Sequence, residues 1–317
     1  MARPLRILYP GAFYHVTSRG NEKKDIFKSL RDREKFLEYL SSASERYGAV
    51  IHAYCLMSNH FHLLLETPAG NLSQIMRHII GAYTTYFNIK RQRFGHLFQG
   101  RYKALLVEAD EYAAELTRYI HLNPVTAGIA GKPDEYKWSS YQSYIGKTTT
   151  PEWLKTGFIL ESFGKNASAA RKNYRDFVEK IDTEGYEGPL KCAVGGAILG
   201  SPDFIEEITG TYLKEREKDK DIPALKHFSD RPPISDIIDT AKEAIKENEK
   251  LARQAGIYLC HKYSGASLKE IACKFDVGVS AIGEASKLFM KKMEQDASLR
   301  KQIDRAVIKI RKWKMES

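Results

Sequence analysis

The chain has 317 residues, with 50 Lys and Arg against 40 Asp and Glu, which gives a formal net charge of +10. This length exceeds one small domain, and a hydrophobic content of 43% is enough for ordinary buried cores. The sequence has no run of 18 apolar residues and no signal-peptide pattern at its start, so we expect a soluble, intracellular protein without a membrane partner. The cysteines form no CxxC pair, which predicts reduced thiols; they are Cys55, Cys192, Cys260 and Cys273.

The positive charge is concentrated at the two ends of the chain. Residues 1–130 hold 17 Lys and Arg against 11 Asp and Glu, and residues 241–317 hold 17 against 10. Residues 131–240 are mildly acidic, with 16 against 19. Two basic regions around an acidic connector are typical of two modules that contact phosphates, although basic surfaces are also common without such partners.

The first predicted elements alternate between strand and helix. Phe13 to Arg19 alternates as a strand, Arg31 to Tyr47 has the apolar spacing of a helix, and Val50 to Met57 predicts a second strand. A third strand follows directly, and it carries the first residues that indicate chemistry.

His60 and His62 flank one apolar residue in this third strand, which ends at Glu66. Successive side chains of a strand point to opposite faces, so the two histidines share a face, with Cα atoms roughly 6.5–7 Å apart. Two imidazoles at this spacing can converge on one divalent metal ion, while Phe61 and Leu63 face a core. The pair predicts a metal site, although such a pair also occurs in ordinary core packing.

Two further elements follow. Leu72 to Lys90 predicts an amphipathic helix, whose Tyr83 and Tyr86 fit a core or groove wall better than a base-stacking surface. Arg91 to Val107 predicts a hairpin in which cations alternate with aromatic rings. This pattern fits a surface for single-stranded nucleic acid, and a solvated edge is the equal alternative. The residues concerned are Arg91, Arg93, Phe94, His96, Phe98, Arg101, Tyr102 and Lys103.

Glu111 to Val125 predicts a helix with Asp110 as its N-cap and a proline that closes it. Tyr119 and Asn123 are four residues apart and project from nearly the same face. A phenol above a carboxamide places a nucleophile next to a metal ligand. His121 lies two residues from Tyr119 and should face away from it, although His121, like His96, could also approach the metal.

The later chain predicts a helical connector and a second motif. In residues 146–234, aromatic residues recur at helical spacing, and the glycines near residue 195 predict a turn because they lack a phosphate-loop pattern. Ser267 to Phe275 then predicts a short helix, Asp276 to Val279 a turn, and Ser280 the cap of a helix to about Met293. This arrangement is a helix-turn-helix.

These motifs resemble the HUH single-tyrosine transposases, and among them the REP-associated tyrosine transposases. The resemblance covers roughly the first 145 residues in the family's order, in the segments 1–6, 14–21, 53–62 and 119–125. It implies an α+β fold in which residues 1–145 form an HUH nuclease domain with a central antiparallel sheet. The histidines would lie on a central strand and the tyrosine on a helix packed across it. A helical connector (146–234) and an all-α helix-turn-helix domain (235–317) would follow.

The resemblance also implies roles for four residues. His60, His62 and Asn123 would be metal ligands, and Tyr119 the nucleophile. Mg²⁺ or Mn²⁺ suits this ligand set, and zinc is the alternative because Cys55 precedes the pair. The expected protein is a metal-dependent single-stranded DNA endonuclease and strand transferase. It would act on hairpins of repetitive extragenic palindromes through a 5′-phosphotyrosine intermediate.

The terminal unit resembles the DNA-binding domain of the bacterial replication initiator, with residues 279–283 in place of that family's recognition sequence. We therefore expect single-stranded hairpins and flanking duplex DNA as partners and a cytoplasmic, nucleoid-associated location, with a homodimer left open. The expected DNA contacts are Arg3, Arg6, Arg19, Arg101, Lys103, Ser280 and Lys287. The alternatives are a catalytically silent DNA-binding regulator and a replication or mobilisation nickase. The presence of all four site residues favours the enzyme.

Overall fold

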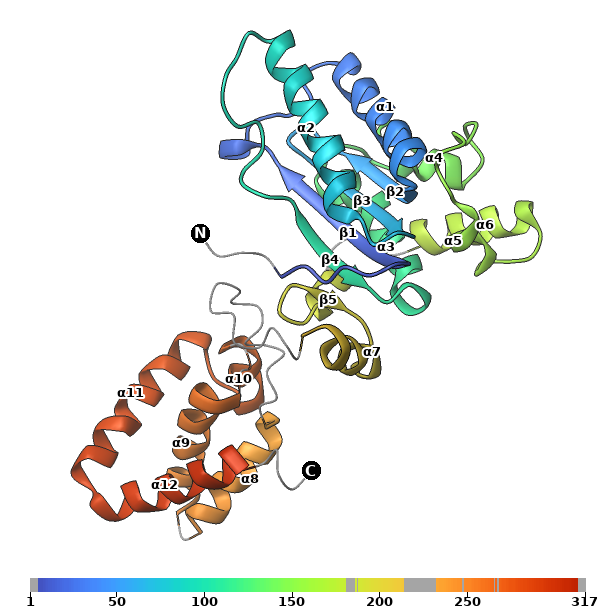
Figure 1. The fold of residues 1–317 in the computed structure, drawn as a ribbon. Helices are drawn as coiled ribbons and strands as arrows, with labels where there is room; N and C mark the ends of the chain where they lie inside the picture. Colours follow the sequence, from blue (N-terminus) through green and yellow to red (C-terminus); the bar gives the residue numbers. More distant parts are fainter. Residues whose placement is uncertain are drawn as a thin grey trace. The chain divides into compact units, whose positions relative to one another are not determined.

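The computed structural model describes residues 5–180, 186, 188–213, 232–246, 248–264, 266 and 268–312. These residues form two compact units, one up to residue 213 and one from residue 232 onward (Figure 1). Within these described ranges, no helix has the length and apolar character needed to cross a membrane. All four cysteines are free thiols.

The first unit is built on a five-stranded sheet of order β2-β3-β1-β4-β5. Its strands are β1 (Ala12–Arg19), β2 (Val50–Leu56), β3 (His60–Thr67), β4 (Lys103–Val107) and β5 (Ile198–Leu199). β3 pairs antiparallel with β1 and β2, and β1 pairs antiparallel with β4. β5 pairs parallel with β4, so the sheet is mixed where we expected it to be antiparallel. The α+β class is confirmed, with β3 in the interior of the sheet.

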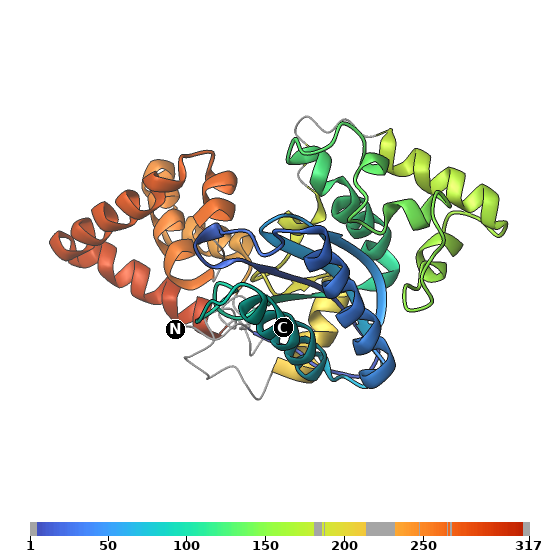
Figure 2. The ribbon, with the colours of Figure 1, turned by 90° about the horizontal axis from the view of Figure 1, so that it is seen from above.

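Helices cover both faces of this sheet. α1 (Leu30–Tyr47) and α2 (Leu72–Lys90) lie on one face and α3 (Ala109–Thr126) on the other (Figures 1 and 2). The side chains of β3 point alternately toward the two layers of helices. Phe61 packs against Phe36 of α1, while Leu64 joins the core beneath α3. Among the described residues of the unit, the remaining α-helices are α4 (Tyr141–Tyr144), α5 (Gly157–Glu161), α6 (Ala167–Glu179) and α7 (Pro202–Ile208).

The hairpin predicted for Arg91 to Val107 is wrong. Only β4 is a strand, and it pairs with β1 instead of the residues just before it. Those residues form a loop, joined to the end of β1 by a bridge between Gly20 and Phe98. The alternation of rings and cations failed as a hairpin signal because Phe98 and Tyr102 are buried, whereas Phe94 is 95% exposed.

The predicted N-cap of α3 is wrong. Asp110 is not the N-cap of α3, because the helix begins at Ala109 and the cap residue is Glu108. The Glu108 carboxylate accepts hydrogen bonds from the backbone and hydroxyl of Ser201.

In α2, Tyr83 is fully buried, which supports the core interpretation of that helix's tyrosines.

In the predicted connector, residues 146–180, 186 and 188–213 are described and belong to the first unit. Tyr174, Val178 and Leu199 are buried in the same core as Ile120 of α3. The aromatic spacing seen in the sequence therefore serves burial against α3. The predicted boundary at residue 145 does not mark the end of this compact unit.

The second unit consists of helices with their own apolar core. They are α8 (Ile234–Ala244), α9 (Glu249–Leu259), α10 (Leu268–Phe275), α11 (Val279–Gln295) and α12 (Ala297–Lys312). α10 and α11 are joined by a short turn, and Ala272 and Ile282 are buried in the core of this unit. Ser280 is not the cap of α11, because the cap residue is Gly278 and Ser280 lies in the first turn. DNA binding by this unit stays a prediction.

A buried carboxylate joins α1 to α2. Ser29 caps α1 in a capping box with Asp32, and the Asp32 side chain, which is 0% exposed, pairs with Lys90 at 2.9 Å and with Arg91. Burial by itself raises the pKa of Asp32, but the hydrogen bonds from Lys90, Arg91 and the start of α1 outweigh it and lower the pKa to about 2. The start of α1 is therefore tied to the end of α2 by an ionised group.

Asp32→Asn should destabilise the protein at neutral pH by on the order of 2 kcal/mol, since the folded state lowers this pKa from 3.8 to about 2. The stabilisation by the ionised Asp32 side chain is complete above the pKa of this group in the unfolded protein. It is lost as the pH falls through the pKa of the group in the folded protein. Urea unfolding at about pH 7 and about pH 2.5 measures this contribution. The difference in the free energy of unfolding between parent and variant should be smaller at the lower pH. Glu38→Gln, which removes an exposed carboxylate from the same helix, is the control. An equal difference in the free energy of unfolding at both pH values would contradict this account.

Candidate active site

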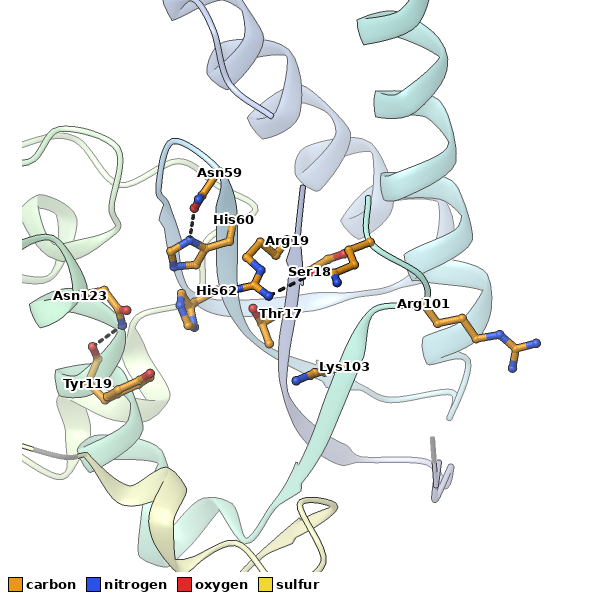
Figure 3. Close-up of a pocket in the computed structure, with 11 residues that line it drawn as sticks. Thr17, Ser18, Arg19, Asn59, His60, His62, Arg101, Lys103, Tyr119 and Asn123 are labelled. Atoms are coloured by element: carbon orange, nitrogen blue, oxygen red, sulfur yellow. Dashed lines mark hydrogen bonds between the residues drawn. The ribbon is translucent and has the colours of Figure 1, made fainter. Parts of the chain in front are cut away.

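A cleft of about 660 Å³ lies where β1, β3 and β4 meet α3 (Figure 3). Its lining includes all four residues predicted as nucleophile and metal ligands. Three of the predicted DNA contacts, Arg19, Arg101 and Lys103, line the same cleft. The fold thus brings into one site residues that are up to about a third of the chain apart.

Strand register sets the positions of these side chains. His60 on β3 pairs with Arg19 on β1, and His62 pairs with Thr17. Thr17 pairs in turn with Lys103 on β4. Cross-strand partners lie side by side on one face of a sheet, so the register alone places the two histidines and both cations on the face that meets α3.

His60 is oriented by its neighbour Asn59. The Nδ1 of His60 lies 2.7 Å from Oδ1 of Asn59, whose amide donates to the carbonyl of Lys23 at 3.0 Å. An amide oxygen only accepts, so Nδ1 of His60 donates and Nε2 of the neutral ring keeps a free lone pair. Burial, with the nearby Arg19, lowers the pKa of His60 and favours that neutral form.

His62 is oriented by His15, a residue that we did not predict. Nε2 of His15 lies 2.9 Å from Nδ1 of His62, and both rings are buried. Burial lowers the pKa of His15 to about 4 and, with the two neighbouring histidines, holds that of His62 well below its usual value. Both rings are therefore neutral. When Nδ1 of His62 donates to His15, Nε2 of His62 is free to bind a metal ion.

Tyr119 and Asn123 project from α3 toward the histidines (Figure 3). The Tyr119 ring stands edge-on to His62, with centroids 5.8 Å apart, and to His15 at 6.1 Å. The Asn123 amide donates to the backbone carbonyl of Tyr119 at 2.8 Å, which leaves its Oδ1 free. Burial raises the pKa of Tyr119, and the Asn123 amide opposes this in part.

The free atoms of this site fit a divalent cation. They are Nε2 of His60, Nε2 of His62 in the tautomer that donates from Nδ1 to His15, and Oδ1 of Asn123. Within the described residues no three His, Cys, Asp or Glu side chains are placed to hold a metal, so the amide oxygen is needed to complete a set of three. Burial raises the pKa of the Cys55 thiol far above neutrality, which does not favour the zinc alternative.

The charge of the cleft is positive. Arg19, Arg101 and Lys103 supply three cations, and none of the described residues that line the cleft carries a carboxylate. Lys103 points toward the histidines, whereas the Arg101 side chain extends away from them (Figure 3). Arg19 donates to Gln99 at 3.2 Å. Such a cleft attracts an anionic substrate.

The other predicted DNA contacts do not line this cleft. Arg6 lies over the ring of Tyr102, the residue just before β4, at 3.9 Å, and burial lowers the pKa of Arg6. Arg3 lies outside the described residues. Ser280 and Lys287 belong to α11 of the second unit, where Lys287 is exposed.

The two remaining histidines considered as metal ligands also lie away from the cleft. His121 is buried and binds Tyr174 and Ser140 at 2.7 Å each, so it faces away from Tyr119 as predicted. His96 is exposed in the loop before β4 and does not line the cleft.

A phenol beside paired neutral imidazoles, in a cationic cleft, has the groups needed to attack a phosphate ester. Residues 9–123 match the model of a family described as IS200-like transposases. This range contains His60, His62, Tyr119 and Asn123, so the resemblance predicted from the motifs is confirmed for that part of the chain.

Among solved structures, a REP-associated tyrosine transposase bound to a REP hairpin matches this chain with 16% identity and a TM-score of 0.40. The match covers 50% of this chain and 93% of that chain. No curated protein matches the chain.

Proposed function

We propose that the protein is a metal-dependent single-stranded DNA endonuclease and strand transferase of the transposase type, acting on palindromic repeat hairpins. One observation carries the proposal: Tyr119 of α3 lies against His62 of β3, 5.8 Å between ring centroids, inside a cleft lined by cations. The family match over residues 9–123 supports the same class of enzyme.

Tyr119 is the nucleophile in this proposal. Its phenolic oxygen forms a bond to the phosphorus of a DNA phosphodiester, and the bond from phosphorus to the 3′ oxygen breaks. The phenolic proton passes to solvent, and the departing 3′ oxygen takes a proton from solvent. The product is a 5′-phosphotyrosine link and a free 3′-hydroxyl. A later attack by a 3′-hydroxyl reverses the step and joins strands, because the ester energy is kept in the link.

His60, His62 and Asn123 would hold Mg²⁺ or Mn²⁺ through the free atoms described above. When bound there, such an ion would supply Lewis-acid polarisation of the scissile phosphate and stabilisation of the departing 3′ oxygen. The protein ligands are all neutral, and the described lining has no carboxylate, so the DNA phosphate supplies the negative charge at the site. Arg19 and Lys103 stand on the adjacent strand positions to bind the neighbouring phosphates.

Hairpin oligonucleotides labelled at either end test this function in the presence of Mg²⁺ or Mn²⁺. The label on the 3′ side of the cut should become covalently attached to the protein, and the label on the 5′ side should be released as a shorter strand with a 3′-hydroxyl. Attachment of the 5′-side label would contradict the proposed polarity. Cleavage without any adduct would indicate a hydrolytic nuclease.

We also propose that the second unit binds flanking duplex DNA, with Ser280 and Lys287 of α11 among its contacts. Removing residues 232–317 should leave adduct formation on a short hairpin largely intact, because the cleft residues all belong to the first unit. Affinity for hairpins with duplex flanks should fall, and its dependence on salt should weaken, because fewer counterions are released. Binding of both chains, measured against salt concentration, tests this; equal salt slopes would mean that the second unit does not touch DNA.

A further inference from the structure

We propose that Gly188 is a positioning residue for Tyr119: its bare backbone forms the surface that holds the tyrosine ring beside the histidines. Gly188 has a φ of +63°. A Cβ built on it would overlap Cδ2 of Tyr119 and would lie 3.0 Å from Cε2 and 3.1 Å from Cγ. The ring therefore rests directly against the backbone at this position, with no room for a methyl group.

The chain on both sides of Gly188 is anchored. Tyr186 donates its hydroxyl to Oε1 of Glu115 at 2.7 Å, one turn before Tyr119 on α3. Glu115 is in turn paired with Arg118, whose guanidinium lies over the Tyr186 ring at 5.6 Å. On the other side, Pro189 is buried at the start of the short helical turn Pro189–Cys192. These contacts are made by described residues of the first unit, and they hold Gly188 in place.

The Tyr119 ring is therefore confined from two directions. Gly188 closes one side, and the edges of His15 and His62 approach it at 6.1 and 5.8 Å between centroids. A side chain at residue 188 would push the ring, and hence the phenolic oxygen, out of this place. The region predicted to be a helical connector thus contributes the surface against which the Tyr119 ring rests.

Gly196 provides a control glycine that does not touch Tyr119. It has the same φ as Gly188, +63°, and a Cβ built on it meets nothing within 4 Å. Gly188 combines this φ with a ψ of 172°, a region of backbone space essentially restricted to glycine, so Gly188→Ala carries a backbone cost of its own in addition to the collision with Tyr119. Gly196→Ala involves no such collision.

Thermal unfolding of the full chain tests the contact without reference to activity. Gly188→Ala should lower the unfolding midpoint more than Gly196→Ala does. In a Tyr119→Ala background the collision is removed, so Gly188→Ala should lower the unfolding midpoint less than it does in the parent, whereas Gly196→Ala should have the same effect in both backgrounds. An effect of Gly188→Ala that is equally large with and without the Tyr119 ring would overturn the proposal.

The positioning role rests on the proposed function and needs a second readout. Gly188→Ala should slow adduct formation on a labelled hairpin by about 100-fold, the scale expected for displacing a reacting group by about 1 Å, and should leave hairpin affinity within about twofold. Gly196→Ala should keep the parental rate. A parental rate in Gly188→Ala, with the unfolding difference present, would overturn the positioning role. Absence of an adduct in the parent would overturn the proposed function, while the unfolding comparison would still decide the contact.

Discussion

Tyr119→Phe should abolish the covalent adduct with a hairpin oligonucleotide while leaving folding and hairpin affinity nearly unchanged. The substitution removes one oxygen atom from a ring whose packing against His15 and His62 is retained. Tyr119 is the only tyrosine among the described residues that line the cleft, so the phosphotyrosine link cannot form there without its hydroxyl. Denaturing electrophoresis of labelled reactions measures the adduct, and fluorescence anisotropy measures the affinity.

Tyr112→Phe is the control for this result, because Tyr112 lies two turns earlier on α3 and does not line the cleft. It should form the adduct at the parental level. Undiminished adduct in Tyr119→Phe would contradict the assignment of the nucleophile and would direct attention to Tyr112.

His60→Ala and His62→Ala should each reduce cation-dependent cleavage by at least about 100-fold. Each change removes one neutral nitrogen donor, and a bound cation contributes several kcal/mol of transition-state stabilisation to such a step. A chelator should have the same effect on the parent protein. Titration of Mn²⁺ in the presence of uncleavable hairpin DNA should show weaker binding in both variants.

His78→Ala is the matched control, because His78 of α2 bonds to Ser42 on the opposite face of the sheet. It should leave cleavage unchanged. Full cleavage by the parent in a chelator would show that His60 and His62 serve packing and not metal binding.

Local sequence patterns predicted the elements that are determined by local physics. The bounds of α2 follow from one apolar stripe, and those residues are buried in the structure; they are Leu72, Ile75, Met76, Ile79, Tyr83 and Phe87. The site residues on β3 and α3 were found for the same reason. His60 and His62 are two apart on a strand, and Tyr119 and Asn123 are four apart on a helix, so each pair shares a face by periodicity.

The features that were missed depend on non-local contacts. His15 reaches His62 only because β1 pairs with β3, and the sequence around His15 does not indicate this strand pairing. Gly188 contacts Tyr119 from about 70 residues downstream. Apart from the glycine itself, nothing in the local sequence indicates its positive φ. The false hairpin before β4 has the same origin, because Phe98 and Tyr102 alternate with cations in sequence but are buried by the tertiary fold.

The central claim is that Tyr119 becomes joined to DNA, and peptide mapping of the adduct tests it most directly. The full chain is incubated with a hairpin oligonucleotide and Mn²⁺, digested with protease and nuclease, and analysed by mass spectrometry. We predict a single modified peptide, carrying a 5′-linked nucleotide on Tyr119. A nucleotide on any other residue, or cleaved DNA with no modified peptide, would contradict the proposed mechanism.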